Sequence, residues 1–325
     1  MKKLNRISLL VILVVMSVVL SGCVKEDSAA GPEFTIGINQ IAEHPALDDA
    51  RRGFEDGLKE MGISAKIEFK NAQGDIPTLT TISQKFVSDK VDLIYAIGTQ
   101  TAQASKQVTS DISVLFSAVT DPVKAGIVKD WDDVGGNVSG TSDLADTESQ
   151  LKMFKEIDPS IEKIGIIFNT SEPNSEVQIA TVKELAPAEG LEVITTGVSN
   201  INEMAQSLDS LLNKVDALYI LSDNMVASSI DLVANKLIEK EMISVSAEES
   251  QVGGGILITD GLSYYELGKQ TARMAKEILI DKKSPSTMPV ERAEKTSIIV
   301  NEKTLESLKL NKSLSLFKDA NMIGK

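Results

Sequence analysis

The chain has little of several residue types that build catalytic and nucleic-acid-binding sites. Its 325 residues include one histidine, one cysteine and one tryptophan, and aromatic residues make up 4%. With His44 alone, neither a metal site of several histidines nor a charge relay with a second imidazole is available. Positive charge is also scarce, since the formal net charge is −14 and falls to −17 without Lys2, Lys3 and Arg6. A nucleic acid is not expected as a partner, because phosphate binding needs a basic face.

A phosphate-binding glycine loop is missing as well. The most glycine-rich run, Val252 to Gly255, continues with Ile256 and Leu257 where a P-loop needs Lys and then Ser or Thr. We interpret this run as a turn before a buried strand. The sequence predicts no catalytic residue, no metal site and no cofactor, and we expect that the protein is not an enzyme.

The single cysteine ends an N-terminal segment that is typical of an exported protein. Three cations precede an apolar stretch, Ile7 to Leu20, which is shorter than the roughly 20 residues that span a bilayer. The following run, Leu20-Ser21-Gly22-Cys23, resembles the lipobox of bacterial lipoproteins, whose cysteine carries a lipid and becomes the new N-terminus. We expect a signal peptide at 1–22, a tether at 23–33, and a lipid on Cys23 that holds the protein on the extracytoplasmic face of the cell membrane. The alternative is an uncleaved membrane anchor or a free buried cysteine.

The rest of the chain contains an internal repeat. Residues 90–100, Lys-Val-Asp-Leu-Ile-Tyr-Ala-Ile-Gly-Thr-Gln, match residues 214–224, Lys-Val-Asp-Ala-Leu-Tyr-Ile-Leu-Ser-Asp-Asn, without a gap. Residues 35–39 have a similar partner in 163–169. The repeat predicts two lobes of like topology.

Within each lobe, short apolar runs alternate with amphipathic helical patterns, such as a helix over 45–61. The strands predicted in the first lobe are 34–38, 65–69, 93–97, 114–119 and 138–141. Those predicted in the second lobe are 164–168, 191–195, 217–221, 243–246 and 255–258. This alternation predicts an α/β fold of two doubly wound lobes, each a parallel sheet covered by helices on both faces.

Polar side chains follow these strands directly, and ligands of doubly wound sheets bind beyond the carboxyl ends of the strands, near helix N-termini. The candidate ligand-binding residues of the first lobe are Gln40, Glu43, His44, Thr99, Gln100, Thr120 and Asp121. Those of the second lobe are Asn169, Ser171, Asn174, Ser175, Asp223, Asn224 and Glu248. The same residue types also cap helices, so capping remains an alternative for each, and Thr120-Asp121-Pro122 favours a turn.

The two lobes differ in charge at one matched pair of positions. Asp223 corresponds in the repeat to the neutral Thr99. One lobe thus offers donors to a carboxylate and the other a carboxylate to an ammonium group, which suits a zwitterion such as an amino acid. Tyr264 and Phe168 are candidates for an aromatic wall or for the core, and we favour a surface or hinge position for Trp131.

Besides the lipobox, the segments 40–48, 97–99, 116–122, 140–143 and 261–268 carry a family resemblance. Together they are similar to the tryptophan/tyrosine-type substrate-binding lipoproteins of ABC importers, over nearly all of the chain after the leader. The resemblance implies the periplasmic-binding-protein type I fold, with one lobe at 34–143 plus 260–283 and the other at 144–259 plus 290–325. It implies a helix at 264–279 on the first lobe, a strand at 296–300 in the second, and hinge crossings near 141–148, 259–263 and 282–289.

The resemblance also implies a function. The protein is expected to capture a small amino acid, an aromatic one and tryptophan in preference, between two closing lobes. It would act as a monomer and deliver this ligand to an ABC permease with its ATPase. A ligand-binding component of a membrane sensor, or an importer receptor for a non-aromatic solute, remains the alternative.

Overall fold

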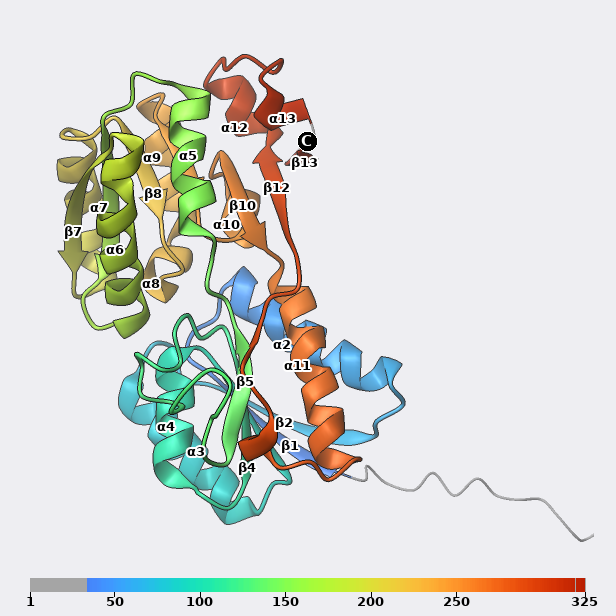
Figure 1. The fold of residues 1–325 in the computed structure, drawn as a ribbon. Helices are drawn as coiled ribbons and strands as arrows, with labels where there is room; N and C mark the ends of the chain where they lie inside the picture. The colour runs from blue at the N-terminus through green and yellow to red at the C-terminus, as the bar shows by residue number, and fades with distance from the viewer. Residues whose placement is uncertain (1–33, 319, 325) are drawn as a thin grey trace, which may run out of the picture. The chain divides into compact units, whose positions relative to one another are not determined.

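A computed structural model describes residues 34–318 and 320–324 (Figure 1). The expected signal peptide, Cys23 and the tether lie outside the described residues. The first sheet has six strands in the order β11-β5-β4-β3-β1-β2, and each neighbouring pair is parallel. Its strands are β1 (Phe34–Gln40), β2 (Ala65–Asn71), β3 (Leu93–Ile97), β4 (Ser113–Ser117), β5 (Val138–Ser142) and β11 (Glu291–Arg292).

The second sheet has seven strands in the order β13-β12-β10-β9-β8-β6-β7. Its strands are β6 (Lys163–Asn169), β7 (Glu192–Val198), β8 (Ala217–Ile220), β9 (Ile243–Ser246), β10 (Ile258–Leu262), β12 (Thr296–Asn301) and β13 (Asn321–Ile323). Its pairs are parallel except for β10 with β12. The order β2-β1-β3-β4-β5 in one sheet therefore matches β7-β6-β8-β9-β10 in the other, as the sequence repeat predicts.

Helices connect the strands in the alternation expected of a doubly wound fold. Those between strands of the first sheet are α2 (Pro45–Glu60), α3 (Ile76–Asp89) and α4 (Thr99–Val108). The second half contains α5 (Thr147–Ile157), α6 (Pro173–Leu185), η1 (Ala186–Glu189), α7 (Ile201–Leu212), α8 (Asn224–Ala227), α9 (Ile230–Glu239), α10 (Glu249–Gly253), α12 (Glu302–Ser307) and α13 (Ser315–Lys318). Buried aliphatic and aromatic side chains fill the space between these helices and each sheet. The predicted α/β class with two parallel-sheet lobes is confirmed.

Most predicted strands begin or end at slightly different residues in the structure, and two of these differences have a cause in the backbone. The fourth strand of the first lobe stops at Ser117, because Ala118 adopts a positive φ of 56° that does not continue a strand. The strand expected at 255–258 begins only at Ile258, because Gly255 has a φ of 109°. β10 then runs through the crossing expected at 259–263.

The helix α11 (Tyr264–Leu279) follows β10 of the second sheet but lies against α2 (Figure 1). A Cβ atom on Gly268 would lie 2.0 Å from the backbone oxygen of Ala50, and one on Gly53 would lie 1.9 Å from that of Tyr265. The two glycines thus permit a backbone contact that side chains would prevent. After η2 (Pro285–Thr287), Glu291 and Arg292 pair with β5 in the first sheet. We therefore propose that the return to the second lobe follows Arg292, later than the boundary at 290.

Candidate functional site

A cavity lies where loops from the two sheets meet, and the space free of protein atoms in it and at its open mouth is about 330 Å³. The first sheet and its helices supply His44, Ala46, Leu47, Thr99, Ala118, Thr120, Asp143 and Tyr264. The second supplies Asn174, Ser222, Asp223, Asn224, Ala227, Glu248 and Gln251. Of the residues predicted from the sequence, seven are in this lining: His44, Thr99, Thr120, Asn174, Asp223, Asn224 and Glu248.

An outer cleft, which shares Asn224 with the cavity, contains four more of the predicted residues. They are Glu43, Gln100, Asn169 and Ser171. Gln40, Asp121 and Ser175 line neither space. Asp121 instead accepts hydrogen bonds from the backbone N–H groups of Val123 and Lys124 at 3.1 and 2.9 Å, as the turn alternative predicts.

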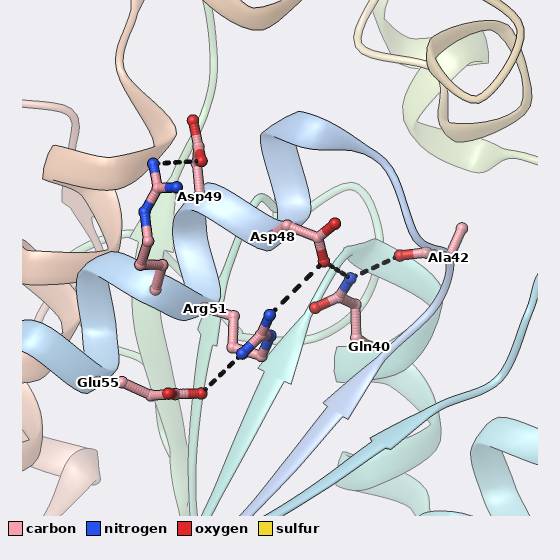
Figure 2. Close-up of polar contacts among 7 residues, drawn as sticks. Gln40, Ala42, Asp48, Asp49, Arg51 and Glu55 are labelled. Carbon is pink, nitrogen blue, oxygen red and sulfur yellow. Dashed lines mark hydrogen bonds and ion pairs between the residues drawn. The ribbon is translucent and has the colours of Figure 1, made fainter.

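Gln40 holds the loop that presents His44. Its side chain is fully buried, and Nε2 donates to the backbone oxygen of Ala42 at 2.7 Å and to Oδ1 of Asp48 at 2.9 Å. Asp48 lies 4.0 Å from Arg51, which also pairs with Glu55 (Figure 2). The loop between β1 and α2 is therefore tied to the first turn of its own helix.

The first turn of α4 presents unpaired donors to the cavity. Gly98, before the helix, provides no side-chain cap, and the first amide N–H groups of a helix have no partner within it. The hydroxyl of Thr99 lines the cavity and is buried without a hydrogen-bond partner. This helix end suits a negatively charged group of a ligand.

Asp143, directly after β5, is the carboxylate of the described lining that has an oxygen without a hydrogen-bond partner. Oδ2 accepts a hydrogen bond from the Tyr264 hydroxyl at 2.5 Å, whereas Oδ1 is buried without a partner. The side chain is 4% exposed, and this burial raises the pKa of Asp143. Oδ1 of Asp143 is therefore free to accept a hydrogen bond from a cationic group of a ligand in the cavity.

Glu248, which precedes α10, adds a second carboxylate. Its two oxygens accept from the backbone N–H and the hydroxyl of Ser250 at 2.6 and 2.8 Å. Burial raises the pKa of Glu248 to about 7, and the nearby Asp143 contributes to this shift. None of the described residues that line the cavity is Lys or Arg, so the cavity favours a ligand with a positive charge.

Asp223, expected to bind an ammonium group, is fully occupied by protein donors. Oδ2 accepts from the N–H of Asn169 and the hydroxyl of Ser175, both at 2.7 Å, and Oδ1 accepts from the N–H of Val226 at 3.0 Å. The side chain thus caps α8 and joins three segments of the second lobe. Burial raises its pKa.

A network around Glu172 orders the second lobe's side of the site. Its carboxylate accepts from the side-chain amides of Asn169, Asn174 and Asn224 and from the backbone N–H of Asn224. Burial and the charge of Asp223 raise the pKa of Glu172 to about 7. Asn174 keeps Oδ1 buried and unpartnered, and it lines the cavity.

Two hydrogen bonds cross the cleft in the part of the chain that the structure describes. Nε2 of His44 lies 3.1 Å from Oδ1 of Asn224, and Nε2 of Gln100 donates to the backbone oxygen of Ser171 at 2.7 Å. Burial lowers the pKa of His44. The neutral ring then donates from Nε2 and leaves Nδ1, which is buried without a partner, as an acceptor.

The sequence reasoning missed lining residues as candidates, among them Asp143 and Gln251. Asp143 lies in the segment 140–143 that carried the family resemblance, and Tyr264 was named only as a possible wall. Phe168 does not line the cavity, and Trp131 packs instead against Arg292 and the first core. The signal for Asp143 was its place directly after the fifth strand of the first lobe.

Within residues 34–318 and 320–324, no group of three His, Cys, Asp or Glu side chains is arranged to hold a metal ion. In the same residues, no helix is long and apolar enough to cross a membrane.

Comparison with known proteins supplies a family and several relatives. The model of the family described as ABC transporter substrate binding protein matches residues 35–323. A curated relative, the tyrosine-binding protein of Clostridioides difficile (strain R20291), is 40% identical over 327 residues, covering 96% of this chain and 94% of the relative.

Solved structures agree with this match. An ABC domain from Streptococcus pneumonia in complex with L-Trp has a TM-score of 0.85 at 32% identity. The ligand-free, open structure of a substrate-binding protein with adhesive properties from Clostridium difficile has a TM-score of 0.69 at 42% identity. In both cases the match covers 89% of this chain and 99% of the other.

Proposed function

Because the chain belongs to the family of ABC transporter substrate-binding proteins, we propose that its cavity captures a small amino acid, preferably an aromatic one. The observation that carries this proposal is the pairing of opposite chemistries across one cavity. A buried carboxylate with a free oxygen, Asp143, and the uncapped start of α4, at Thr99, line the same cavity. An α-amino acid carries the complementary ammonium and carboxylate groups.

Family membership confirms two of the predictions. The protein is a substrate-binding protein and not an enzyme. The fold is that of the type I periplasmic-binding proteins, which the structural likeness to a leucine-binding protein of Thermotoga maritima, at 12% identity and a TM-score of 0.57, also reflects.

We assign the ammonium site to Asp143, with Glu248 nearby, in place of Asp223. All three carboxylates line the cavity, but protein donors already occupy both oxygens of Asp223 and of Glu248. An ammonium group donates three hydrogen bonds, and its hydrogen bond to a carboxylate is stronger in a site without water. The free Oδ1 of Asp143 offers the acceptor that such a group requires.

The ligand carboxylate then lies at the start of α4. The hydroxyl of Thr99 and the free amides of the first turn would donate to it, and the helix dipole favours its charge. This places ammonium and carboxylate against elements of the first lobe, and Glu248 brings the second lobe into contact with the same ligand.

The ligand side chain would lie among the apolar residues Ala46, Leu47, Ala118 and Ala227, with Tyr264 close by. Small-molecule sites are mostly apolar with a few polar groups directed into them, and the lining of this cavity has both kinds of residue. Unpartnered acceptors on Asn174 and Gln251 also line it. A ring with its own donor, the phenol of tyrosine or the indole of tryptophan, would satisfy an acceptor that phenylalanine or leucine would leave unpaired.

Closure of the two lobes would bury the ligand. The relative described as ligand-free and open has the higher sequence identity, 42%, yet the lower TM-score, 0.69, compared with 32% and 0.85 for the L-Trp complex. A different arrangement of similar lobes would account for that inversion. We infer a hinge at the crossings between the lobes, with the segment around Asp143 as one of its strands.

Delivery to an ABC permease and its ATPase, and attachment through a lipid on Cys23, complete the proposal. The family match supports the first, and the run Leu20-Ser21-Gly22-Cys23 supports the second. Capture for a membrane sensor is the alternative. Disruption of a neighbouring permease gene would abolish ligand uptake for a transporter and leave uptake intact for a sensor subunit.

The test is isothermal titration of the purified protein, after unfolding and refolding to remove carried-over ligand. Tyrosine, tryptophan, phenylalanine, leucine and a nucleoside are titrated in parallel. We expect one-to-one binding of tyrosine or tryptophan, and at least about 10-fold weaker binding of phenylalanine, since one unpaired buried acceptor costs about 1–3 kcal/mol. Binding of the nucleoside alone, or of none of the five, would refute the ligand class.

A further inference from the structure

The two hydrogen bonds across the cleft are related by the internal repeat. Gln100 and Asn224 occupy the same repeat position, two residues after Gly98 and Ser222, at the start of α4 and α8. His44 and Glu172 also correspond, because each precedes a helix that begins with proline after the first strand of its lobe. Each lobe therefore extends one amide side chain to the same loop of the other lobe.

The geometry of the two contacts follows this symmetry. Asn224 accepts, at 3.1 Å, from the ring of His44, the residue before α2. Gln100 donates, at 2.7 Å, to the backbone of Ser171, the residue before Glu172. One contact lies beside the cavity, and the other lies in the outer cleft.

Both ends of the His44 contact are held by their own lobes. Glu172 accepts from the backbone N–H and from Nδ2 of Asn224, which leaves Oδ1 directed across the cleft. On the other side, Gln40 and Asp48 hold the loop that carries His44 (Figure 2). Groups that are ordered before closure lose little conformational entropy when the contact forms.

We propose that Gln100 and Asn224 form a two-point latch that sets how long the lobes stay closed, and hence the release rate of any ligand, without selecting among ligands. This inference rests on the proposed function, because it assumes that the lobes close on a ligand. Contacts that form after encounter act mainly on dissociation, so the association rate should be unaffected.

Gln100→Ala is the test variant, because Gln100 contacts the other lobe but does not line the cavity. Gln103→Ala is its matched control: Gln103 lies on the same helix and donates to the backbone oxygen of Ala125, within its own lobe, at 2.9 Å. Stopped-flow fluorescence would give association and dissociation rates for tyrosine and for tryptophan with the wild type and both variants.

We expect Gln100→Ala to release both ligands roughly 2- to 10-fold faster, which corresponds to one neutral hydrogen bond. The ratio of the two ligands' affinities and the association rates should match the wild type, and Gln103→Ala should match it throughout. Unchanged release from Gln100→Ala, or acceleration for only one ligand, would overturn the latch.

A second measurement keeps the latch testable if the wild type binds neither amino acid, which would count against the proposed function alone. Cysteines for spin labels are introduced at two exposed positions, by Gln84→Cys in α3 and Asn202→Cys in α7, and Cys23→Ser removes the native cysteine. The distance between the two labels, measured without ligand, reports the separation of the lobes. The latch predicts a short-distance population that Gln100→Ala reduces and Gln103→Ala preserves. Absence of that population from the wild-type background, or its persistence in Gln100→Ala, would contradict the proposal.

Discussion

Replacing Asp143 with asparagine tests the ammonium site most directly. Among the described lining carboxylates, Asp143 has the oxygen without a partner, and its other oxygen accepts from Tyr264. Asparagine has nearly the same shape and can keep an oxygen toward Tyr264. The substitution therefore removes the charge and the free acceptor while the wall of the cavity stays in place.

The expected loss follows from the burial of this carboxylate. A hydrogen bond to a charged group contributes about 1.5–3 kcal/mol, and breaking one side of a buried charge pair costs about 2–5 kcal/mol. Glu248 remains close enough to the cavity to compensate in part. We expect a loss of about 2–3 kcal/mol, which is a roughly 30- to 150-fold weaker affinity for tyrosine or tryptophan.

Isothermal titration at pH 8 measures this affinity, and thermal unfolding of the ligand-free protein supplies the control. Burial raises the pKa of Asp143, so its ionised form is disfavoured in the folded state, and Asp143→Asn should leave Tm unchanged or raise it. Asp223→Asn should instead lower Tm by about 3 °C or more, because its amide N–H₂ would face either the N–H of Val226 or the two donors, Asn169 and Ser175, that share the other oxygen.

The two variants together distinguish the two assignments. Affinity within about 3-fold of the wild type for Asp143→Asn, combined with loss of binding but an unchanged Tm for Asp223→Asn, would refute the present reasoning. That outcome would support the assignment to Asp223 made from the sequence alone.

Affinity should also depend on pH through Glu248, whose pKa is raised to about 7 by burial. A bound ammonium favours the ionised carboxylate, so titrations should show affinity rising from pH 6 to pH 8, and Glu248→Gln should flatten that rise; a flat wild-type profile would contradict this. Gly268→Ala should lower Tm by roughly 3–10 °C, because its Cβ would lie 2.0 Å from the Ala50 oxygen and force α2 and α11 apart. Gly253→Ala is the control, since a Cβ there meets no atom within 4 Å, and an equal fall in both variants would rule out the close contact as the cause.

Much of the fold was predictable from local pattern. The apolar run 93–97 and its repeat in 217–221 appear as the buried strands β3 and β8, and the helix predicted at 45–61 is α2 at Pro45–Glu60. These elements follow from hydrophobic periodicity, which a sequence displays directly. Their ends were less predictable: the positive φ of Ala118 that stops β4 has no signal in the residue itself.

The region of the site was also predictable, because the carboxyl ends of parallel strands meet at one edge of a sheet. Seven of the predicted residues do line the cavity. The roles of individual side chains were not predictable, since Asn, Asp, Ser and Thr both cap helices and bind ligands.

Asp143 and Asp223 illustrate the difference. Each is an aspartate shortly after a strand, and the repeat, which matches Asp223 with the neutral Thr99, favoured Asp223 as the ammonium partner. Asp223 meets donors from three segments, Asn169, Ser175 and Val226, which are brought to it by the packing of β6, α6 and α8. Asp143 accepts from Tyr264, which is far away in the chain, on one oxygen, and its other oxygen has no hydrogen-bond partner.

The sequence by itself therefore determined the class of fold, the two-lobed repeat and the edge of each sheet where a ligand binds, because these depend on periodicity and on connection order. Only the tertiary structure decided which carboxylate keeps a free oxygen and which amides reach across the cleft. Those properties depend on partners that are distant in the chain, and the number of donors around a buried oxygen is set by packing and not by local pattern.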